Sequence, residues 1–280
     1  MLNALTFDIE DYYQVEAFKE LIKFEDWPQY PSRVVENTRK ITDILDERHV
    51  KATFFVLGWI AERFPDLVKQ LAEHGHEIAT HGYGHQMIYK QTQATFEADL
   101  VKSIAILEQI SGQNVIGYRA PTYSIIEQSF WAFDILIRHH LRYDSSIFPI
   151  IHDRYGVPDG ERFPHRIERG DGQGILEFPL STLRVWKWNF PIAGGGYLRL
   201  FPYLFLKKSF QWLNKQQHPV IVYLHPWELD PAQPRIPNIP PMTRFRHYLN
   251  LHSTAAKLRK LIQDFEFAPI RDVLPFSDKP

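Results

Sequence analysis

Short apolar runs alternate with longer amphipathic segments through most of this sequence. The pattern predicts buried strands at 4–7, 51–57, 77–80, 115–118 and 219–224, and helices at 34–45, 64–71, 96–110 and 130–140. Parallel neighbours need a crossover between them, which a helix usually supplies. Repeated strand–helix units therefore predict an α/β fold whose parallel sheet is closed, or nearly closed, as a barrel.

Residues 149–218 interrupt this alternation. They are rich in Pro, Gly and aromatic side chains, and we interpret them as an insertion folded over the functional site. The 280 residues are 44% hydrophobic, which fits one large domain, here expected to span 1–280. Residues 231–280 then form a C-terminal extension, with a surface helix at 242–264 and a short strand at 265–269.

Four polar residues follow the C-terminal ends of predicted strands, namely Asp8, His81, Arg119 and His225. In α/β barrels the loops at this end of the strands converge and carry the active site. One such placement would mean little, but four suggest a single convergent site.

His81 and His85 are four residues apart, so on a helical turn both imidazoles would face one side and could share an ion. Asp8, Glu10 and Asp11 place three carboxylates at the end of the first strand. Each group alone has a simpler explanation: surface histidines beside a glycine-rich turn, or acids that cap a helix. Together, two imidazoles and one carboxylate suit zinc or another first-row divalent ion, and a second carboxylate can act as general base.

The segment after Arg119 and two later residues complete the candidate site. Arg119 could hold Asp8 ionised, and the backbone N–H of Thr122 could face the site as an oxyanion donor. His225 could protonate a leaving amine, with Asp144 orienting it. The structural alternatives are an arginine that pairs across a loop, a buried histidine bonded to backbone, and an aspartate that caps a helix or turn.

Composition excludes several classes of function. The chain has no cysteine, so disulfides, thiolate metal sites and cysteine nucleophiles are absent. Its formal charge of −1 gives no indication of a nucleic-acid partner. No apolar stretch approaches about 20 residues, and the N-terminus has no signal-peptide pattern. We therefore expect a cytoplasmic protein, with peripheral association at the inner membrane face left open.

Six motifs in order give the sequence a family resemblance: TFDIED, ATFFVLG, HEIATHGYGH, GYRAPTYS, YDSS and LHPWE. Over about residues 3–230 the chain resembles the polysaccharide deacetylase family, also called carbohydrate esterase family four, which includes chitooligosaccharide deacetylases. Two further stretches, FPIAGGGYLRLFPY and HPWELDP, resemble a subgroup associated with bacterial exopolysaccharide and exosortase gene clusters. The resemblance implies a distorted (β/α)7 barrel.

The resemblance also implies roles for single residues. Asp8 matches the family's general base and Arg119 the arginine that tethers it. His81 and His85 match the two metal ligands. His225 matches the catalytic histidine, and Asp144 matches the acid that supports it.

Two departures from the family pattern matter. Ile9 stands where the family has its aspartate ligand, so we expect Glu10 to bind the metal, with Asp11 as the fallback. Thr122 replaces an aromatic residue, which leaves its backbone N–H available. The implied cofactor is a divalent metal, Zn²⁺ first, with Co²⁺ or Ni²⁺ as alternatives.

The implied function is metal-dependent hydrolysis of the N-acetyl group of a sugar in a polysaccharide or its precursor, releasing acetate. The expected partner is an N-acetylated glycan or a lipid-linked sugar, with possible association with a membrane polysaccharide-synthesis complex. Three alternatives remain at this point. They are a non-catalytic glycan-binding or scaffold protein of an export system, an allantoinase-like amidohydrolase, and a glycoside hydrolase that needs only two carboxylates.

Overall fold

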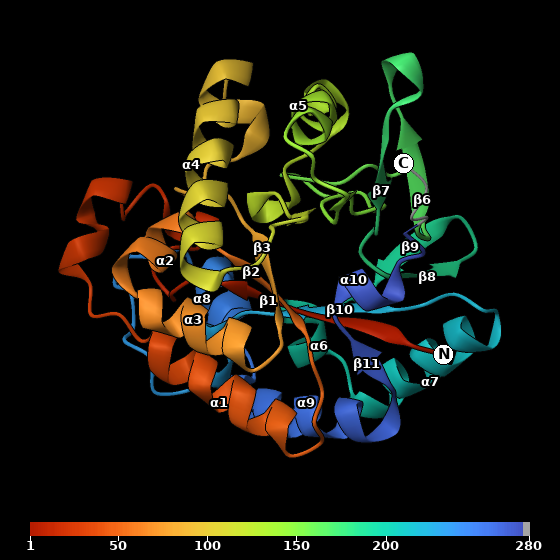
Figure 1. Cartoon of the computed structure of the whole chain (residues 1–280). Helices are drawn as coiled ribbons and strands as arrows, with labels where there is room; N and C mark the ends of the chain where they lie inside the picture. Colours follow the sequence, from red (N-terminus) through yellow and green to blue (C-terminus); the bar gives the residue numbers. More distant parts are fainter. Residues whose placement is uncertain (277–280) are drawn as a thin grey trace.

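Seven parallel strands curl into an incomplete barrel in the computed structural model, which describes residues 1–276 (Figure 1). In sheet order they are β10 (Ile221–Leu224), β1 (Asn3–Ile9), β2 (Thr53–Val56), β3 (Glu77–Thr80), β4 (Gly117–Tyr118), β5 (Tyr143–Asp144) and β7 (Gly174–Glu177). β6 (His165–Glu168) pairs antiparallel with β7, and β11 (Phe267–Ala268) pairs parallel with the start of β1. This is the α/β barrel architecture that the sequence predicts.

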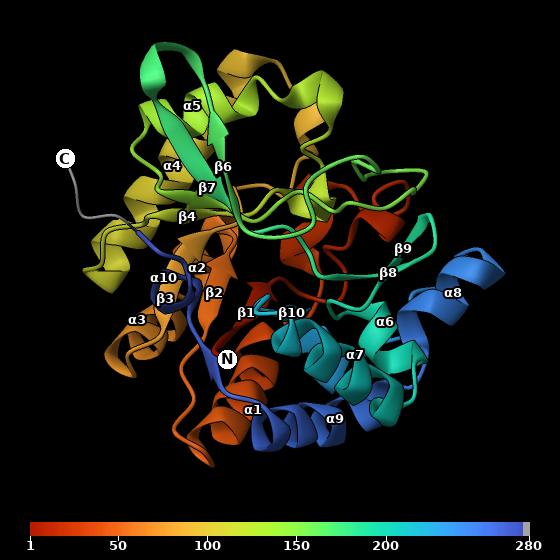
Figure 2. The same cartoon turned by 90° about the vertical axis from the view of Figure 1, so that its right-hand side faces the viewer.

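The helices lie mainly on the outside of the sheet (Figures 1 and 2). They are α1 (Val34–Asp46), α2 (Gly58–Arg63), α3 (Pro65–Glu73), α4 (Gln93–Ser111), α5 (Ala132–Arg138), α6 (Gly196–Leu200), α7 (Tyr203–Lys215), α8 (Pro241–Tyr248), α9 (Leu251–Asp264) and α10 (Ile270–Val273). Single 3-10 turns follow several strands, including η4 (Pro121–Tyr123) and η7 (Pro226–Leu229). α4 begins at a Thr92 cap and ends at Gly112, whose φ of 66° suits a residue without a side chain.

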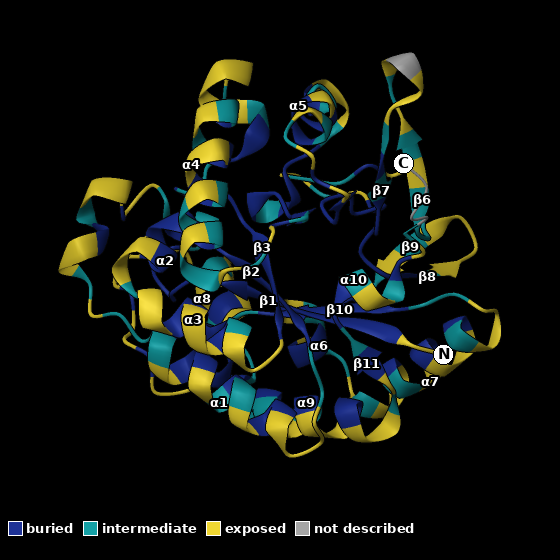
Figure 3. Ribbon diagram, viewed as in Figure 1, coloured by how far each residue is buried: buried dark blue, intermediate teal, exposed yellow. Residues whose placement is uncertain are grey.

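All seven residues of β1 are buried, because the sheet is covered on both faces (Figure 3). Alternation along the strands divides the core into two clusters. Leu5 and Phe7 belong to the larger one, which includes much of the apolar surface of the outer helices. Ala4 belongs to the smaller one, together with Phe55 and Tyr223. Even-numbered residues of β1 thus share a face, and this face leads to Asp8.

The segment at 149–218 contributes strands of two sheets. β7 joins the main sheet beside β5, whereas β8 (Thr182–Val185) and β9 (Trp188–Pro191) form a separate antiparallel hairpin. The helix predicted at 242–264 is two helices, because Asn250 between α8 and α9 has a φ of 49°. The last four residues of the predicted extension at 231–280 lie outside the described residues. Across residues 1–276, no helix has both the length and the apolar character to cross a bilayer.

Candidate active site

Glu10, His81 and His85 form a buried cluster at the C-terminal ends of β1 and β3. One potential ligand atom from each lies within 4.8 Å of the other two. Glu10 Oε2 is 2.9 Å from His85 Nε2, and the two imidazole rings are 5.4 Å apart between centroids. The three donors therefore converge on one point.

The loop after β3 brings the two histidines together without a helix. Gly82 and His85 have φ values of 76° and 51°, so the chain turns through the left-handed region twice. The carboxylate of Asp99, on α4, accepts hydrogen bonds from the backbone N–H of Tyr83 (2.7 Å) and Gly84 (3.1 Å). The expected helical turn is therefore wrong, and an anchored loop produces the same convergence.

The donor set fits a divalent metal ion. The carbonyl oxygen of Arg119 lies 2.8 Å from His81 Nδ1, and a carbonyl can only accept, so Nδ1 carries the proton and Nε2 is free to bind an ion. Burial lowers the pKa of His81 to about 4, which keeps this imidazole neutral at pH 7. Glu10 Oε2 is buried and forms no hydrogen bond with any described residue, despite its closeness to His85. One carboxylate and two imidazoles suit Zn²⁺ or a similar ion.

The charge of Glu10 is strongly stabilised by its surroundings. Burial acts to raise its pKa, but the nearby His85, His225 and His81 outweigh burial and lower that pKa to about 2. Trp227 Nε1 also donates to Glu10 Oε1 over 3.3 Å. Glu10 is thus held as a carboxylate and aimed at the histidines.

Asp11 lies apart from this cluster. Its Oδ2 accepts hydrogen bonds from Ser32 Oγ (2.6 Å) and from the backbone N–H of Arg33 (2.9 Å) and Val34 (3.2 Å). The carboxylate therefore caps the N-terminus of α1, where the first N–H groups have no partner within the helix. This arrangement favours Glu10 over Asp11 as the third ligand.

Asp8 and Arg119 are buried side by side at the edge of the cluster. Arg119 Nη1 donates to Asp8 Oδ1 over 2.7 Å, and the rest of the guanidinium is held by Thr6 and Ser145. These hydrogen bonds fix the direction of the Asp8 carboxylate. Asp8 Oδ2 faces His225 Nε2 at 3.9 Å.

His225 is oriented by Glu228 rather than by Asp144. Its Nδ1 lies 2.8 Å from Glu228 Oε1, and Arg199 Nε donates to the other oxygen of that carboxylate over 2.7 Å. Burial acts to lower the pKa of His225, but Glu10, Glu228 and Asp8 outweigh it and raise that pKa to about 9. The expectation that Asp144 supports this histidine is corrected accordingly, because Glu228 reaches it from within the same turn.

Asp144 supports the segment that follows Arg119. Its carboxylate accepts from Ser146 Oγ (2.6 Å), and Ser146 Oγ in turn accepts from the backbone N–H of Ala120 (2.7 Å). Burial raises the pKa of the neighbouring Glu177 well above its usual range, with the charge of Asp144 as the next cause. Thr122, two residues beyond Ala120, has a φ of 57° and lines the pocket.

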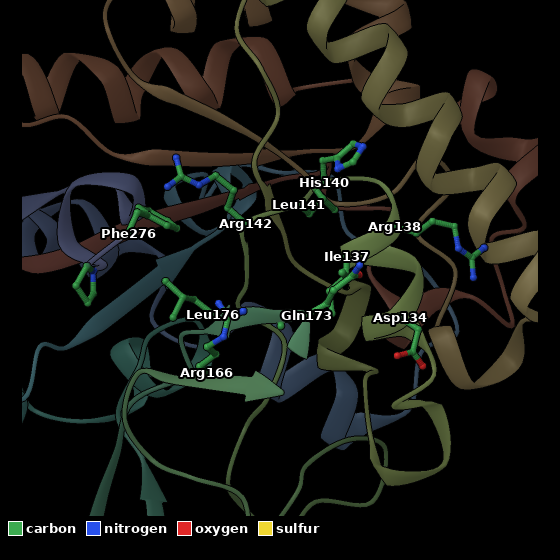
Figure 4. A pocket seen from close by; sticks show the side chains of 12 residues that line it. Asp134, Ile137, Arg138, His140, Leu141, Arg142, Arg166, Gln173, Leu176 and Phe276 are labelled. Carbon is green, nitrogen blue, oxygen red and sulfur yellow. The ribbon is translucent and has the colours of Figure 1, made fainter. Parts of the chain in front are cut away.

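A cavity of about 250 Å³ opens onto all these groups. Its lining includes Asp8, Glu10, His81, His85, Thr122 and His225, together with Glu16, His152, Arg154, Tyr155, Trp227 and Arg246. A larger cavity of about 880 Å³ lies between α5, β6, β7 and residues 275–276 (Figure 4). Several of its charged side chains pair at the surface, for example Arg138 with Glu97, and the metal-type cluster lies elsewhere. The smaller cavity is therefore the candidate active site.

Sequence reasoning missed Glu228, Arg199 and Asp99. The spacing of His225 and Glu228 is that of a capping box, with Glu228 accepting from the His225 backbone N–H, and this signal was available in the sequence. Arg199 lies far away in the chain, so only the folded structure brings it to Glu228.

Two family models and several known proteins match parts of this chain. Residues 13–133 match the family model described as "Polysaccharide deacetylase", and residues 145–275 match a "Domain of unknown function (DUF3473)". A peptidoglycan-N-acetylglucosamine deacetylase from Bacillus cereus is 37% identical over 112 residues, or 40% of this chain and 39% of that protein. A peptidoglycan deacetylase from Helicobacter pylori is 26% identical over 182 residues, or 61% and 57%. The chain thus spans less than two thirds of either relative.

Solved structures share the fold. A Mycobacterium smegmatis protein assigned to the polysaccharide deacetylases superposes with a TM-score of 0.67 at 22% identity, covering 97% of this chain and 88% of that one. Puue allantoinase gives 0.61 at 14% identity, with coverages of 97% and 88%. A CE4 family pseudoenzyme from Bacillus anthracis gives 0.51 at 14%, with coverages of 98% and 65%. At these identities the likeness concerns the fold alone.

Proposed function

Because the chain belongs to the polysaccharide deacetylase family, we propose that it hydrolyses the N-acetyl group of an N-acetylated sugar and releases acetate. The observation that carries this proposal is the convergence of Glu10, His81 and His85 in one cavity that also holds Asp8 and His225. Ligands, base and acid are then all present within one site. A glycoside hydrolase would leave the histidine pair without a role.

Glu10, His81 and His85 would hold the metal, which we propose to be Zn²⁺, with Co²⁺ or Ni²⁺ as alternatives. When bound, such an ion supplies Lewis acidity toward the acetamide carbonyl and lowers the pKa of water. Asp11 has no part in this set, because its oxygens accept the α1 backbone N–H groups.

Asp8 acts as the general base that removes a proton from the attacking water. Arg119 Nη1 donates to Asp8 and fixes the direction of its carboxylate. The backbone N–H of Thr122 donates to the acetyl carbonyl oxygen, which becomes the oxyanion of the tetrahedral intermediate. Asp144 positions this donor indirectly, because it accepts from Ser146 Oγ, which in turn accepts from the backbone N–H of Ala120.

His225 protonates the departing amine. A general acid must carry its proton at neutral pH, and the Glu228 carboxylate on Nδ1 stabilises the charged imidazole. Nε2 then points to the cavity, 3.9 Å from Asp8 and 3.4 Å from Glu10. The base and the acid therefore lie on neighbouring sides of the point where the acetamide would bind.

The finer assignments are predictions from the sequence. They are a glycan or lipid-linked substrate, a polysaccharide-synthesis complex as partner, a link to exopolysaccharide and exosortase gene clusters, and a cytoplasmic location at the inner membrane face. The site itself sets one requirement on the substrate, which is an acetamide-bearing sugar that can enter a cavity of about 250 Å³.

Acetate release from N-acetylglucosamine oligomers tests the proposal directly. The purified protein, supplied with Zn²⁺, should release acetate, and the His81→Ala variant should not. His74→Ala is a matched control, because that histidine is exposed and lies outside the cluster. Normal turnover by His81→Ala, or equal loss in both variants, would contradict the assignment.

A further inference from the structure

Large apolar side chains are exposed on the β8–β9 hairpin, on the loop at 149–160 and on α8, and the last two of these segments also contribute residues to the cavity lining. The turn between β8 and β9 carries Trp186, which is 94% exposed, and next to it Trp188 at 59%. Ile151 is 69% exposed on the preceding loop, and Met242 and Phe245 are 60% and 55% exposed on α8. Apolar groups of this size in one region mark a surface that meets another phase or partner.

The β8–β9 hairpin and α8 both lie toward the right-hand edge of Figure 2, with the loop at 149–160 beside the hairpin. Figure 1 shows that the hairpin and α8 are well separated across the width of the molecule. Asn189 on β9 donates to the carbonyl of Pro149 over 2.7 Å, which ties the hairpin to that loop. Arg154 of the loop and Arg246 of α8 both line the active-site cavity. The exposed apolar groups therefore flank the route to the site.

The hairpin and α8 are basic in a chain whose formal charge is −1. Residues 182–191 and 241–248 contain four lysines and arginines and no acid, whereas the loop at 149–163 carries two arginines and three acids, Asp153, Asp159 and Glu161. The exposed basic side chains near the mouth are Arg154, Arg184, Lys187, Arg244 and Arg246. None of these five forms an ion pair with a carboxylate in the described part of the chain. Their charge is available to an anionic partner.

We propose that this face docks on an anionic lipid bilayer, with the β8–β9 turn inserted among the headgroups and the cavity mouth turned toward the membrane. Tryptophan side chains favour the bilayer interface, since the ring is apolar and its N–H can still meet water or headgroups. Lysine and arginine beside them attract acidic lipids. The tryptophans of the β8–β9 turn thus suit the bilayer interface, and the lysines and arginines beside them suit the acidic headgroups.

A sugar-stacking platform is the competing reading of the exposed tryptophans. Stacking would use flat rings, yet Val185, Ile151 and Met242 are exposed in the same region and offer no such face. Insertion into lipid uses aliphatic and aromatic groups alike. A neutral glycan would also gain little from the five basic side chains. The combination therefore favours a membrane over a soluble glycan.

A membrane-facing mouth has a consequence for the substrate, which rests on the proposed deacetylase function. The N-acetyl sugar would be presented from the membrane, joined to a lipid through an anionic group such as a phosphate diester or diphosphate. Arg154 and Arg246 line the outer part of the cavity and would meet that group. The acetamide would then reach the inner cluster at Glu10.

Vesicle co-sedimentation tests the docking surface without any deacetylation. The protein should bind vesicles of phosphatidylcholine with phosphatidylglycerol more tightly than phosphatidylcholine alone, and added salt should weaken binding. The double variant Trp186→Ser with Trp188→Ser should bind about tenfold or more weakly. Trp212→Ser, an exposed tryptophan on α7 with 45% exposure, is the matched control and should bind like the parent. Arg184→Glu with Lys187→Glu should abolish the preference for phosphatidylglycerol.

Three results would overturn the inference. They are no vesicle binding by the parent protein, equal binding by the hairpin variant, and fluorescence of Trp186 and Trp188 that responds to soluble N-acetylglucosamine oligomers but not to vesicles. The melting temperature of each variant shows that it is folded. Failure of the proposed function is distinguishable, because a protein without acetate release could still bind vesicles through this face.

Discussion

Separate substitutions of Glu10 and Asp11, the two neighbouring acids after β1, distinguish the proposed metal ligand from the acid that caps α1. Glu10→Gln keeps the size of the side chain but replaces one ligand oxygen of the cluster by a neutral amide. Asp11→Asn makes the same change one residue later, where the carboxylate faces the start of α1. The two variants remove one charge each, so they control for each other.

The expected effects have different magnitudes on different measurements. Loss of a residue that only hydrogen-bonds to a metal ligand typically lowers metal affinity about 10–100-fold. Replacing the proposed ligand Glu10 itself should therefore weaken zinc binding by more than about 100-fold. Asp11→Asn should leave zinc affinity within about threefold, because this side chain makes no ligand contact.

Stability should respond in the opposite order. Asp11→Ala removes the acceptor of Ser32 Oγ and of two backbone N–H groups. A lost cap costs about 1–2 kcal/mol and an unsatisfied buried donor about 1–3 kcal/mol, so we expect about 3 kcal/mol in all. At 2–4 °C per kcal/mol for a chain of this size, the metal-free protein should melt about 6–12 °C lower.

Isothermal titration with Zn²⁺ and thermal unfolding without metal give the two readouts. The reasoning is refuted if Asp11→Asn loses zinc binding while Glu10→Gln retains it. Equal loss of zinc affinity in both would also count against it, because it would mean that the acids act as one cluster.

Three further perturbations probe other parts of the structure. Glu228→Gln removes the partner of His225 Nδ1 and should lower kcat about 10–100-fold with little change in KM, as measured by acetate release; an unchanged kcat would remove Glu228 from the site. Burial lowers the pKa of His76 from 6.5 to about 4 in the folded protein. Between these two pH values the unfolded chain carries a proton on His76 and the folded protein does not, so the free energy of unfolding falls as the pH drops from 6.5 to 4. The shift corresponds to about 3 kcal/mol, and His76→Gln should flatten this part of the pH dependence in urea unfolding; an identical slope in the variant would exclude His76 as its source. Gly194→Ala would place a Cβ atom 1.9 Å from the carbonyl oxygen of Tyr223 at a φ of 144°, and should destabilise the fold by at least about 3 kcal/mol, whereas a parental melting temperature would show that this segment can move.

Much of the fold was predictable because its signals are local. The five predicted strands are short, largely apolar runs, and α4 has both its Thr92 cap and its Gly112 stop in the sequence. The split of 242–264 into two helices was not predictable, because Asn250 is compatible with a helix and adopts its φ of 49° in the packed structure. β7 was missed for a related reason, since a four-residue strand needs its neighbour β5 to be recognised.

The sequence by itself determined which residues would reach the site from the strand ends. Parallel strands carry their C-terminal residues to one edge, so Asp8, His81 and His225 converge whatever the loops do. The tertiary structure decided which role each carboxylate has. Glu10 rather than Asp11 joins the histidines, and Glu228 rather than Asp144 reaches His225. A carboxylate can serve as ligand, cap or ion-pair partner, and only the distances set by packing distinguish these roles.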